Sequence, residues 1–281
     1  MDRIQKALDK ARQKHAGNDM DDRIKTQVKD DVQQESSFPH DPLAPALENI
    51  QYTQTKVVKT PASTLESNRV IAGHYNNPQS AVFRMLRTQV LQKMRQNDWQ
   101  SIAITSPTAG EGKSLISTNL AVAVAMELNQ TVLLVDMDLR SPSIARYFGL
   151  NVEVGLKEYL EGDLYLHHVL VNPGIERLVV LPGVGRAEDS AELLSSPKMA
   201  SLVKDIKSQY NSRVIIFDVP PLLQTDDVLL STNYFDCTLL VLEDGKNNEA
   251  NIKKSLQLLE GTHLIGTVLN KADTPPSHQN Y

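Results

Sequence analysis

A lysine and a serine at the end of a short glycine-containing loop are well placed to do chemistry. Residues 101–114 read SIAITSPTAGEGKS, an apolar run that passes into small residues and ends in Gly-Lys-Ser. Glycines let successive backbone N–H groups turn toward a phosphate, and a helix that follows adds its positive end. Lys113 can then reach the β- and γ-phosphates of a nucleotide, and the Ser114 hydroxyl can coordinate Mg²⁺. The stretch predicts a phosphate-binding loop, although Pro107 replaces the first glycine of the strict G-x-x-x-x-G-K-[ST] pattern.

Three aspartates follow two other apolar runs. VLLVDMDLR places Asp136 at the end of one run and Asp138 two residues later, and VIIFDVPP places Asp218 at the end of another. In a parallel sheet these ends share the edge that carries the phosphate loop. Mg²⁺ binds a few carboxylate or hydroxyl oxygens, so Ser114 with one or two aspartates is an adequate set, and a remaining carboxylate could accept a proton. A single such aspartate could equally cap a loop, but three beside a Gly-Lys-Ser loop favour the functional interpretation.

The apolar runs alternate with helix-like stretches from about Val70 onward. We predict strands over 101–106, 131–136, 178–181, 213–218, 237–242 and 264–269, and helices over 78–96, 113–129, 143–148, 155–161, 191–210, 226–232 and 247–260. On the helix over 78–96 we expect the apolar side chains to face inward, namely Val82, Met85, Leu86, Val90 and Met94. The runs are continuous in Val, Ile and Leu, as is typical of parallel strands covered on both faces. The predicted fold is therefore α/β, a doubly wound and mainly parallel sheet of the P-loop NTPase type.

The chain before this domain has a different composition. Residues 1–17 are basic and carry a short apolar stripe, which predicts an amphipathic helix that is either solvated or docks on a partner or an anionic membrane surface. Residues 18–69 are polar and rich in proline, and only TKVVKT resembles a strand, so we predict a largely disordered, flexible linker. The expected domains are thus 1–17, 18–69, a P-loop domain over 70–273, and a flexible tail over 274–281.

Composition excludes several classes of protein. A net charge of −5 over 281 residues argues against binding to nucleic acid, which requires a basic surface. The chain starts without the apolar core of a secretory signal and contains no run of 18 apolar residues. Cys237 is the only cysteine, so no intramolecular disulfide can form. We expect a cytoplasmic protein, and the basic start leaves peripheral attachment to the inner face of the cell membrane open.

The three motifs resemble those of a known family. Residues 106–114, 132–140 and 214–221 look like the Walker A, Walker A′ and Walker B motifs of the bacterial tyrosine kinases of capsule and exopolysaccharide synthesis. The more telling features are the D-x-D-x-R form, which ends at Arg140, and the D-x-P-P form that begins at Asp218. GLKEYLEGD, LVVLPGVG and ELLSSPKM also resemble the family, in that order, and MDRIQKALDKARQ is similar to the start of members encoded with exosortase systems.

This resemblance implies an ATP-dependent protein-tyrosine autokinase that regulates exopolysaccharide or capsule polymerisation and export. Lys113 would bind the phosphates, Asp136 would be the base for the tyrosine hydroxyl, and Mg²⁺ would be held by Ser114, Asp138 and Asp218. The segment GTVLNKAD nominates Asn270 for recognition of adenine. The implied nucleotide-binding set is Ala109, Gly110, Glu111, Gly112, Lys113, Ser114, Leu115 and Asn270. The implied partner is the cytosolic tail of a membrane chain-length regulator.

Two departures from the family pattern bear on function. The family usually ends in a cluster of tyrosines that receive phosphate, whereas the last 40 residues here contain only Tyr281, which becomes the candidate acceptor. The family also builds ring-shaped oligomers through an E-x-x-R-x-x-R helix. Here Arg84 and Arg87 are present, but Ala81 replaces the glutamate, so a homo-oligomer through this helix is an open expectation.

A second class of function remains open. The chain could be a nucleotide-switched ATPase, similar to the septum-positioning and plasmid-partition proteins, or a scaffold that regulates a membrane polysaccharide-assembly partner and phosphorylates nothing. Those relatives carry a signature lysine early in the phosphate loop, where this sequence has Thr108. The absence of that lysine and the D-x-P-P form favour the kinase, while the missing tyrosine cluster favours the switch.

Overall fold

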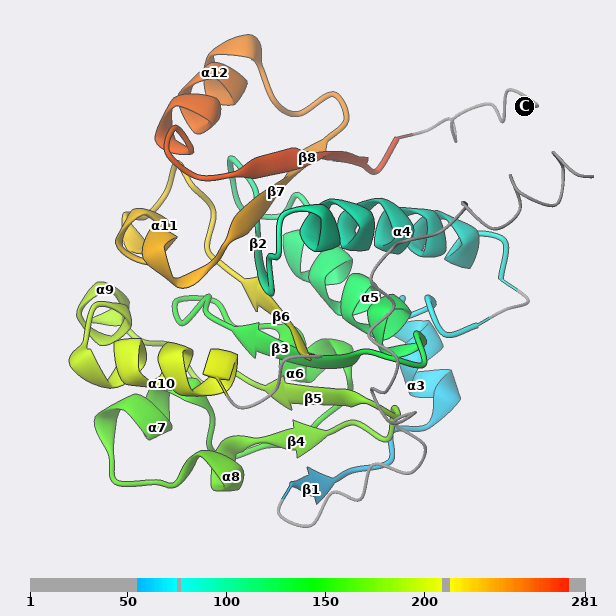
Figure 1. Cartoon of the computed structure of the whole chain (residues 1–281), viewed down its shortest axis with the longest axis vertical. Coiled ribbons are helices and arrows are strands. Elements are labelled where there is room, and N and C mark those ends of the chain that lie inside the picture. Colours follow the sequence, from blue (N-terminus) through cyan, green and yellow to red (C-terminus); the bar gives the residue numbers. More distant parts are fainter. Residues whose placement is uncertain (1–54, 75–76, 209–212, 273–281) are drawn as a thin grey trace, which may run out of the picture. The chain divides into compact units, whose positions relative to one another are not determined.

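The computed structural model describes residues 55–74, 77–208 and 213–272. Their strands are Lys56–Val57 (β1), Ser101–Thr105 (β2), Thr131–Asp136 (β3), Val171–Asn172 (β4), Leu178–Leu181 (β5), Arg213–Asp218 (β6), Cys237–Glu243 (β7) and Leu264–Asn270 (β8). They form one eight-stranded sheet in the order β1-β4-β5-β3-β6-β2-β7-β8 (Figure 1). All neighbouring strands pair in parallel except β4 and β5. The predicted doubly wound, mainly parallel α/β fold is confirmed.

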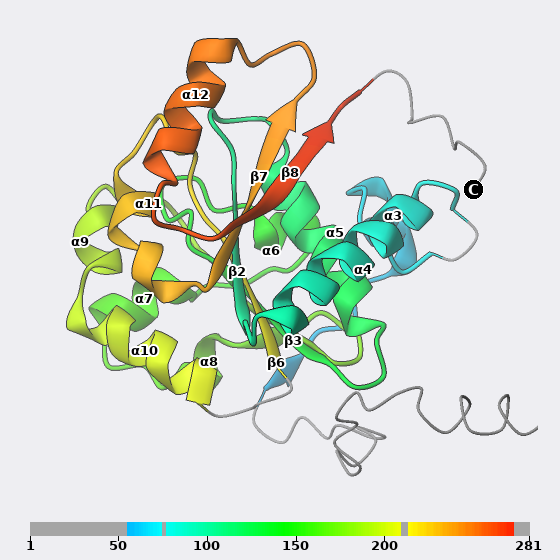
Figure 2. The same ribbon diagram turned by 45° about the horizontal axis from the view of Figure 1, so that its top comes forward.

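Helices cover both faces of this sheet. They are Ala62–Ser67 (α3), Ser80–Gln96 (α4), Lys113–Ala125 (α5), Ile144–Tyr147 (α6), Leu156–Glu161 (α7), Leu166–Val169 (α8), Ser190–Leu194 (α9), Pro197–Ser208 (α10), Asp227–Leu230 (α11) and Glu249–Leu258 (α12), with a 3₁₀ turn at Thr232–Tyr234 (η1). Helices α4 and α5 lie together on one side, and α7, α9 and α10 lie on the other (Figure 1 and Figure 2). Each side encloses its own core of buried apolar side chains.

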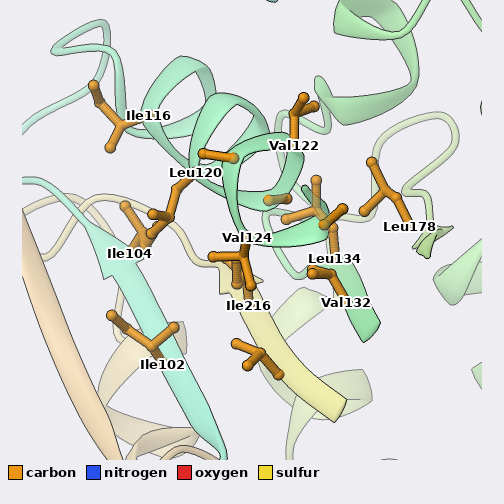
Figure 3. Close-up of a cluster of buried hydrophobic side chains, with 14 of the residues drawn as sticks. Ile102, Ile104, Ile116, Leu120, Val122, Val124, Val132, Leu134, Leu178 and Ile216 are labelled. Carbon is orange, nitrogen blue, oxygen red and sulfur yellow. The ribbon is translucent and has the colours of Figure 1, made fainter. Parts of the chain in front are cut away.

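The central strands are apolar throughout because both of their faces are buried. On β2, Ile102 and Ile104 pack into the core under α5, whereas Ala103 between them packs into the opposite core. Figure 3 shows the first of these cores, in which Leu120 and Val124 of α5 lie against the strands. Burial of strand side chains on both faces is the dominant favourable contribution to the folding free energy of such a sheet.

Most predicted boundaries hold to within a few residues. The strands β3 and β6 match their predicted bounds of 131–136 and 213–218. The helix after the phosphate loop is shorter than predicted, because α5 ends at Ala125 and not near residue 129. The turn that follows leaves Leu128 71% exposed, so the apolar pattern that extended the prediction there has no core to face.

The folded domain begins earlier than the expected boundary at residue 70. Residues 55–69, which we assigned to the flexible linker, contain β1 and α3, and β1 pairs with β4 at the edge of the sheet. The Thr60 hydroxyl donates a hydrogen bond to the carbonyl of Phe148 (2.8 Å), and Leu65 packs on the core. The prediction of a linker up to residue 69 is therefore wrong over this stretch. The strand-like stretch TKVVKT within it contains the two-residue β1, which pairs with β4.

One face of α4 also differs from the prediction. We expected Val82 and Met85 to face inward, but their side chains are 57% and 54% exposed. The buried apolar residues of this helix are Val90, Leu91 and Met94, all in its second half. The first half of α4 therefore presents apolar side chains to the exterior of this chain.

Several predictions fall on residues that the structure does not describe. These are the basic helix over 1–17, the linker over 18–54 and the tail over 274–281 with Tyr281. Within 55–74, 77–208 and 213–272, no helix combines the length and the apolar character that a membrane crossing needs.

Candidate active site

The carboxyl ends of three central strands form the edge at which the predicted site residues meet. The strands β3 and β6 pair in a register that places Asp136 opposite Asp218. The strand β6 also pairs with β2, which sets Asp218 opposite Ile104, and the phosphate loop leaves β2 one residue later. Parallel pairing of apolar strands thus brings the loop and both carboxylates to the same edge.

The phosphate loop depends on glycine at two positions. Gly110 and Gly112 have φ values of 81° and 96°, in the left-handed region that side-chain-bearing residues rarely adopt. Gly112 is the N-cap of α5, so the free N–H groups of the first helical turn open toward the loop. A Cβ atom on Gly112 would lie 2.1 Å from Nδ2 of Asn270 on β8. Both the backbone conformation and the approach of Asn270 therefore require glycine here.

Replacing Gly112 by alanine should weaken nucleotide binding by about tenfold or more, because the strained φ alone costs about 1–3 kcal/mol and Asn270 must also move. Isothermal titration calorimetry with a non-hydrolysable ATP analogue measures the effect. Gly261→Ala is the matched control, since Gly261 has a φ of 92° but no atom within 4 Å of its added Cβ. Equal affinity in the two variants would show that neither the loop conformation nor the contact with Asn270 requires glycine at position 112.

The ammonium group of Lys113 lies at the centre of a cluster of oxygens. Its Nζ is 2.7 Å from Oδ2 of Asp138, 3.2 Å from the Ser114 hydroxyl and 3.5 Å from Oδ2 of Asp218. Burial lowers the pKa of Lys113, but the carboxylates of Asp218 and Asp138 outweigh burial and raise it above the ordinary lysine value. The lysine is therefore charged, and three side-chain oxygens lie around its ammonium group.

Asp218 and Asp136 are both fully buried, and their environments differ. Asp218 accepts a hydrogen bond from the Ser117 hydroxyl (3.0 Å) in addition to its contact with Lys113. Asp136 instead accepts backbone N–H groups, from Ser143 (2.9 Å) and Ile144 (3.0 Å). Burial and the carboxylate of Asp218 raise the pKa of Asp136 to about 7, and burial also raises the pKa of Asp218.

A cavity of about 600 Å³ opens beside the phosphate loop. Five of the predicted nucleotide-binding residues lie on its wall, namely Ala109, Gly110, Gly112, Lys113 and Ser114. Of the three aspartates, Asp138 lies on the wall, whereas Asp136 and Asp218 lie behind it. The wall also carries three arginines, Arg140, Arg146 and Arg186. The cavity is therefore large enough for phosphate groups at the loop, and Arg146 and Arg186 add exposed positive charge to its wall.

The donor set beside the loop fits Mg²⁺. Ser114, Asp138 and Asp218 offer one hydroxyl and two carboxylates around the position that the Lys113 ammonium takes, and hard oxygen ligands of this kind suit Mg²⁺, which keeps several waters. Among the described residues no group of three or more His, Cys, Asp or Glu side chains could hold a metal ion on its own. A metal here would depend on the phosphates of a nucleotide for its remaining ligands.

Glu111 has a structural role that its position in the loop did not reveal. Its side chain is fully buried, and Oε1 accepts hydrogen bonds from the backbone N–H (2.7 Å) and the hydroxyl (2.6 Å) of Thr108. Oε2 accepts from the backbone N–H of Glu243 (3.2 Å), at the end of β7, and from Nδ2 of Asn247 (2.7 Å), in the segment after it. One carboxylate therefore shapes the loop and joins it to β7, the strand beside β2, and to the segment that follows. Glu243 and Asn247 lie more than 130 residues away in the chain, so no local signal indicates them.

The loop is held from outside by further contacts. Asn270 donates from Nδ2 to the carbonyl of Glu111 (2.8 Å), Lys246 donates to the carbonyl of Ala109 (2.6 Å), and Lys271 donates to the carbonyl of Gly110 (2.8 Å). Asn270 therefore lies next to the loop on the side of β8. Of the other predicted binding residues, Leu115 does not line the cavity, and the acceptor candidate Tyr281 lies outside the described residues.

Replacing Glu111 by alanine should raise the KM for ATP about tenfold or more, because four donors lose their buried acceptor and each such loss costs about 1–3 kcal/mol, shared between loop distortion and folding. Glu111→Gln keeps one acceptor oxygen and the volume, so we expect it to recover part of the loss. Steady-state ATPase kinetics and thermal unfolding together measure the effect. A Glu111→Ala protein with wild-type KM and a lowered melting temperature would limit Glu111 to stability.

The arginine of the D-x-D-x-R motif serves as an anchor within the chain. Arg140 pairs with the buried Asp227 at the start of α11, with Nε 3.2 Å from Oδ2 and Nη2 3.4 Å from Oδ1. The hydroxyl of Ser190 donates to the same carboxylate (2.5 Å). No local pattern in the sequence selects Asp227 or Ser190, because their joint position depends on how α9 and α11 pack.

The chain is similar in sequence to known nucleotide-binding domains and tyrosine kinases. Residues 102–281 match the family model described as the CobQ/CobB/MinD/ParA nucleotide binding domain. Over 214 residues the chain is 30% identical to the tyrosine-protein kinase YwqD of Bacillus subtilis (strain 168), an alignment that covers 75% of this chain and 89% of YwqD.

Two solved structures show how the fold relates to the two functions considered. The kinase domain of the Escherichia coli tyrosine kinase ETK superposes with a TM-score of 0.66 at 26% identity, and the match covers 80% of this chain and 94% of that domain. The septum site-determining protein MinD of Pyrococcus horikoshii OT3, in complex with Mg-ADP, gives a TM-score of 0.52 at 25% identity, and covers 63% of this chain and 74% of MinD. The likeness to the kinase domain thus extends over more of both chains. By its motifs, its fold and these relatives, the chain belongs to the bacterial tyrosine-protein kinase family, within the CobQ/CobB/MinD/ParA group of nucleotide-binding domains.

Proposed function

We propose that this chain is an ATP-dependent protein-tyrosine autokinase that acts in the synthesis and export of capsule or exopolysaccharide. The observation that carries the proposal is the convergence of Lys113, Ser114, Asp138 and Asp218 around one point at the phosphate loop. The kinship with tyrosine-protein kinases supports the reaction. The polysaccharide context rests on the resemblance of the motifs to kinases of that pathway.

In the proposed reaction each group has a separate task. Lys113 leaves Asp138 and holds the β- and γ-phosphates, together with the N–H groups of the loop and of the first turn of α5. Ser114, Asp138 and Asp218 would hold Mg²⁺, and when bound this ion would neutralise charge on the phosphate oxygens. The structure of MinD from Pyrococcus horikoshii, which contains Mg-ADP, supports the proposal that this chain binds an adenine nucleotide and Mg²⁺. Asn270, beside the loop on β8, would mark the adenine side of the site.

The base for the tyrosine hydroxyl is proposed to be Asp136. A carboxyl with a pKa near the working pH is well matched to this task, and the pKa of Asp136 is raised to about 7. Asp136 must gain access to the cavity to act, because it is fully buried, its Oδ2 accepts the backbone N–H groups of Ser143 and Ile144, and its Oδ1 accepts that of Asp138 (3.3 Å). Asp138, which already lies on the cavity wall, is the alternative base.

The proposed partner is the cytosolic tail of a membrane chain-length regulator, and the chain would act in the cytoplasm or at the inner face of the membrane. A homo-oligomer through α4 is a second proposal, and the structure constrains it. Arg87 pairs within the chain with Glu127 (3.0 Å) and donates to the carbonyl of Ala123 (3.3 Å), and Arg84 donates to the Ser80 hydroxyl (2.6 Å). An oligomer contact would therefore use the exposed apolar face of α4 as well as these arginines.

Intact mass after incubation with ATP and Mg²⁺ tests the function. We expect one added phosphate that peptide mapping places on Tyr281, lost in the Lys113→Ala variant. If ATP is hydrolysed but no phosphate is added, even with the cytosolic tail of the regulator supplied, the chain is a nucleotide switch or a scaffold. That alternative is favoured by one observation, namely the single tyrosine in the last 40 residues.

A further inference from the structure

The cavity at the phosphate loop extends to one side of the loop. Beyond the loop its wall is formed by Pro221 and Thr225 after β6, by residues 138–147 after β3, and by Arg186 after β5. Since the strand order is β5-β3-β6-β2-β7-β8, these residues lead away from β2 toward β5. In the part of the chain that the structure describes, no residue of β7, β8 or the segments after them lines the cavity.

The direction in which the cavity extends shows which end of the site is open to an acceptor. Asn270 and the segment after β7 contact the loop from the side of β7 and β8, which is the proposed adenine side. In phosphoryl transfer the attacking and leaving oxygens lie roughly in line, so the acceptor enters opposite the nucleoside diphosphate. The cavity end near β3 and β5 is therefore where an acceptor hydroxyl would arrive.

Two exposed arginines give this end a positive charge. Arg146, on α6, and Arg186, after β5, both line the cavity and are exposed. Within the described residues neither guanidinium has an acidic side chain in ion-pair distance, in contrast to Arg140, which is held by Asp227. The acidic residue of the same wall, Asp138, is paired with Lys113. Arg146 and Arg186 are thus available to a ligand.

An aromatic ring lies beside one of these charges. Tyr147 also lines the cavity, and the Arg146 guanidinium lies over its ring, 5.4 Å from the centroid. Aromatic rings pack well against one another in offset or edge-to-face arrangements. The far wall therefore offers one surface for a tyrosyl ring and two cations for carboxylates beside it.

We propose that Arg146, Tyr147 and Arg186 form an acceptor subsite that selects tyrosines flanked by aspartate or glutamate. This inference rests on the proposed kinase function, and it adds a class of substrate beyond Tyr281, which follows Ser-His-Gln-Asn and has no acidic neighbour. The acceptor tyrosine packs against Tyr147 with its hydroxyl toward the phosphate loop, and the neighbouring carboxylates pair with the two guanidinium groups. An exposed ion pair changes affinity by at most about fivefold, so two pairs together should give a preference of about tenfold, and of no more than about 25-fold.

Three peptides test the proposal on the full chain. Each has a central Ala-Tyr-Ala, flanked on both sides by two glutamates, two glutamines or two lysines. With ATP and Mg²⁺ present, we expect kcat/KM to be about tenfold higher for the glutamate peptide than for the glutamine peptide, and lowest for the lysine peptide. The double variant Arg146→Glu/Arg186→Glu should reverse this order, while its KM for ATP stays at the wild-type value.

The matched control is Arg95→Glu, which makes the same change on an exposed arginine of α4 that does not line the cavity. It should keep the preference for the glutamate peptide. Equal phosphorylation of the three peptides by the wild type, or a double variant that still prefers the glutamate peptide, would overturn the acceptor subsite. A raised KM for ATP in the double variant would also overturn it, because the arginines would then bind the nucleotide.

Binding of the same peptides, labelled with a fluorophore and measured by anisotropy with a non-hydrolysable ATP analogue, separates this inference from the proposed function. If no peptide and no tyrosine of the chain is phosphorylated, the kinase function fails. The binding data then decide the subsite alone. Tighter binding of the glutamate peptide, reversed in the double variant, supports it, and equal binding of all three peptides refutes it.

Discussion

Replacing Lys113 by alanine should abolish tyrosine phosphorylation, with a loss of about 10³-fold or more, comparable to the loss of other cations that stabilise the charge of a phosphoryl-transfer transition state. On the cavity wall Arg140 is committed to Asp227, and Arg146 and Arg186 lie at the far end, so none of them replaces the ammonium at the loop. Quantitative mass spectrometry of the phosphorylated chain measures the loss. Retention of more than a tenth of the wild-type rate would refute the assignment of the phosphate loop.

The same variant should reveal how the buried carboxylates are balanced. Without the ammonium, Asp138 and Asp218 lose their ion-pair partner, and loss of one member of a buried pair costs about 3–5 kcal/mol. The pKa values of Asp136 and Asp218 should rise further, because Lys113 lowers both. When folding raises the pKa of a carboxyl group, that group stabilises the fold fully at pH values below its pKa in the unfolded chain. This stabilisation is lost as the pH rises through its pKa in the folded chain. For Asp136 that window runs from 3.8 to about 7 in the wild type.

Denaturant unfolding at several pH values between 4 and 8 tests this balance. The free energy of unfolding of Lys113→Ala should fall more steeply with rising pH than that of the wild type. Lys204→Ala, on the exposed side of α10, is the matched control and should follow the wild-type curve. Parallel curves for wild type and Lys113→Ala would mean that the ammonium does not balance these carboxylates.

Replacing Asp136 by asparagine should lower the rate of transfer by about 10²–10⁴-fold, the usual contribution of a general base, with little change in ATP affinity. The amide oxygen can still accept the backbone N–H groups of Ser143 and Ile144, so the segment before α6 should keep its position. Single-turnover transfer and calorimetric binding separate the two effects, because a base acts in the chemical step and not in the ground state.

Asp138→Asn gives the comparison that decides between the two carboxylates. If Asp138→Asn lowers transfer while its affinity for Mg²⁺ and ATP stays at the wild-type value, and Asp136→Asn does not lower transfer, Asp138 is the base and Asp136 only anchors the segment before α6. If Asp136→Asn lowers ATP affinity as much as transfer, Asp136 acts on bound nucleotide or metal. Each variant needs a circular dichroism spectrum that matches the wild type, because Asp136 is fully buried.

The sequence predicts the central part of this fold well because the relevant signals are local. Continuous apolar runs mark β3 and β6, and an aspartate at the end of each run meets the phosphate loop once the strands pair in parallel. The meeting of Asp136 and Asp218 follows from that register. Their chemical roles depend on what binds in the cavity, so those roles stay predictions.

What the sequence does not reveal depends on distant partners. TKVVKT resembles a strand, but only its pairing with β4 shows that the two-residue β1 belongs to the folded domain. Glu111 looks like a polar residue in a loop until Glu243 and Asn247 are placed against it. The exposure of Met85 on α4 likewise depends on which elements cover the helix. In each case the decisive neighbour is far away in the chain, and composition or periodicity carries no trace of it.

The contacts of Glu111 also set an order of events in synthesis. The phosphate loop emerges from the ribosome more than 130 residues before the residues that complete it. Those residues lie at the ends of β7 and β8 and just after them. Until those residues are made, the Glu111 carboxylate and the carbonyls of Ala109 and Gly110 have none of these distant donors. A nascent chain can therefore form β2 and α5 and still lack a finished phosphate loop. Competence to bind a nucleotide arrives only with the last strand of the sheet.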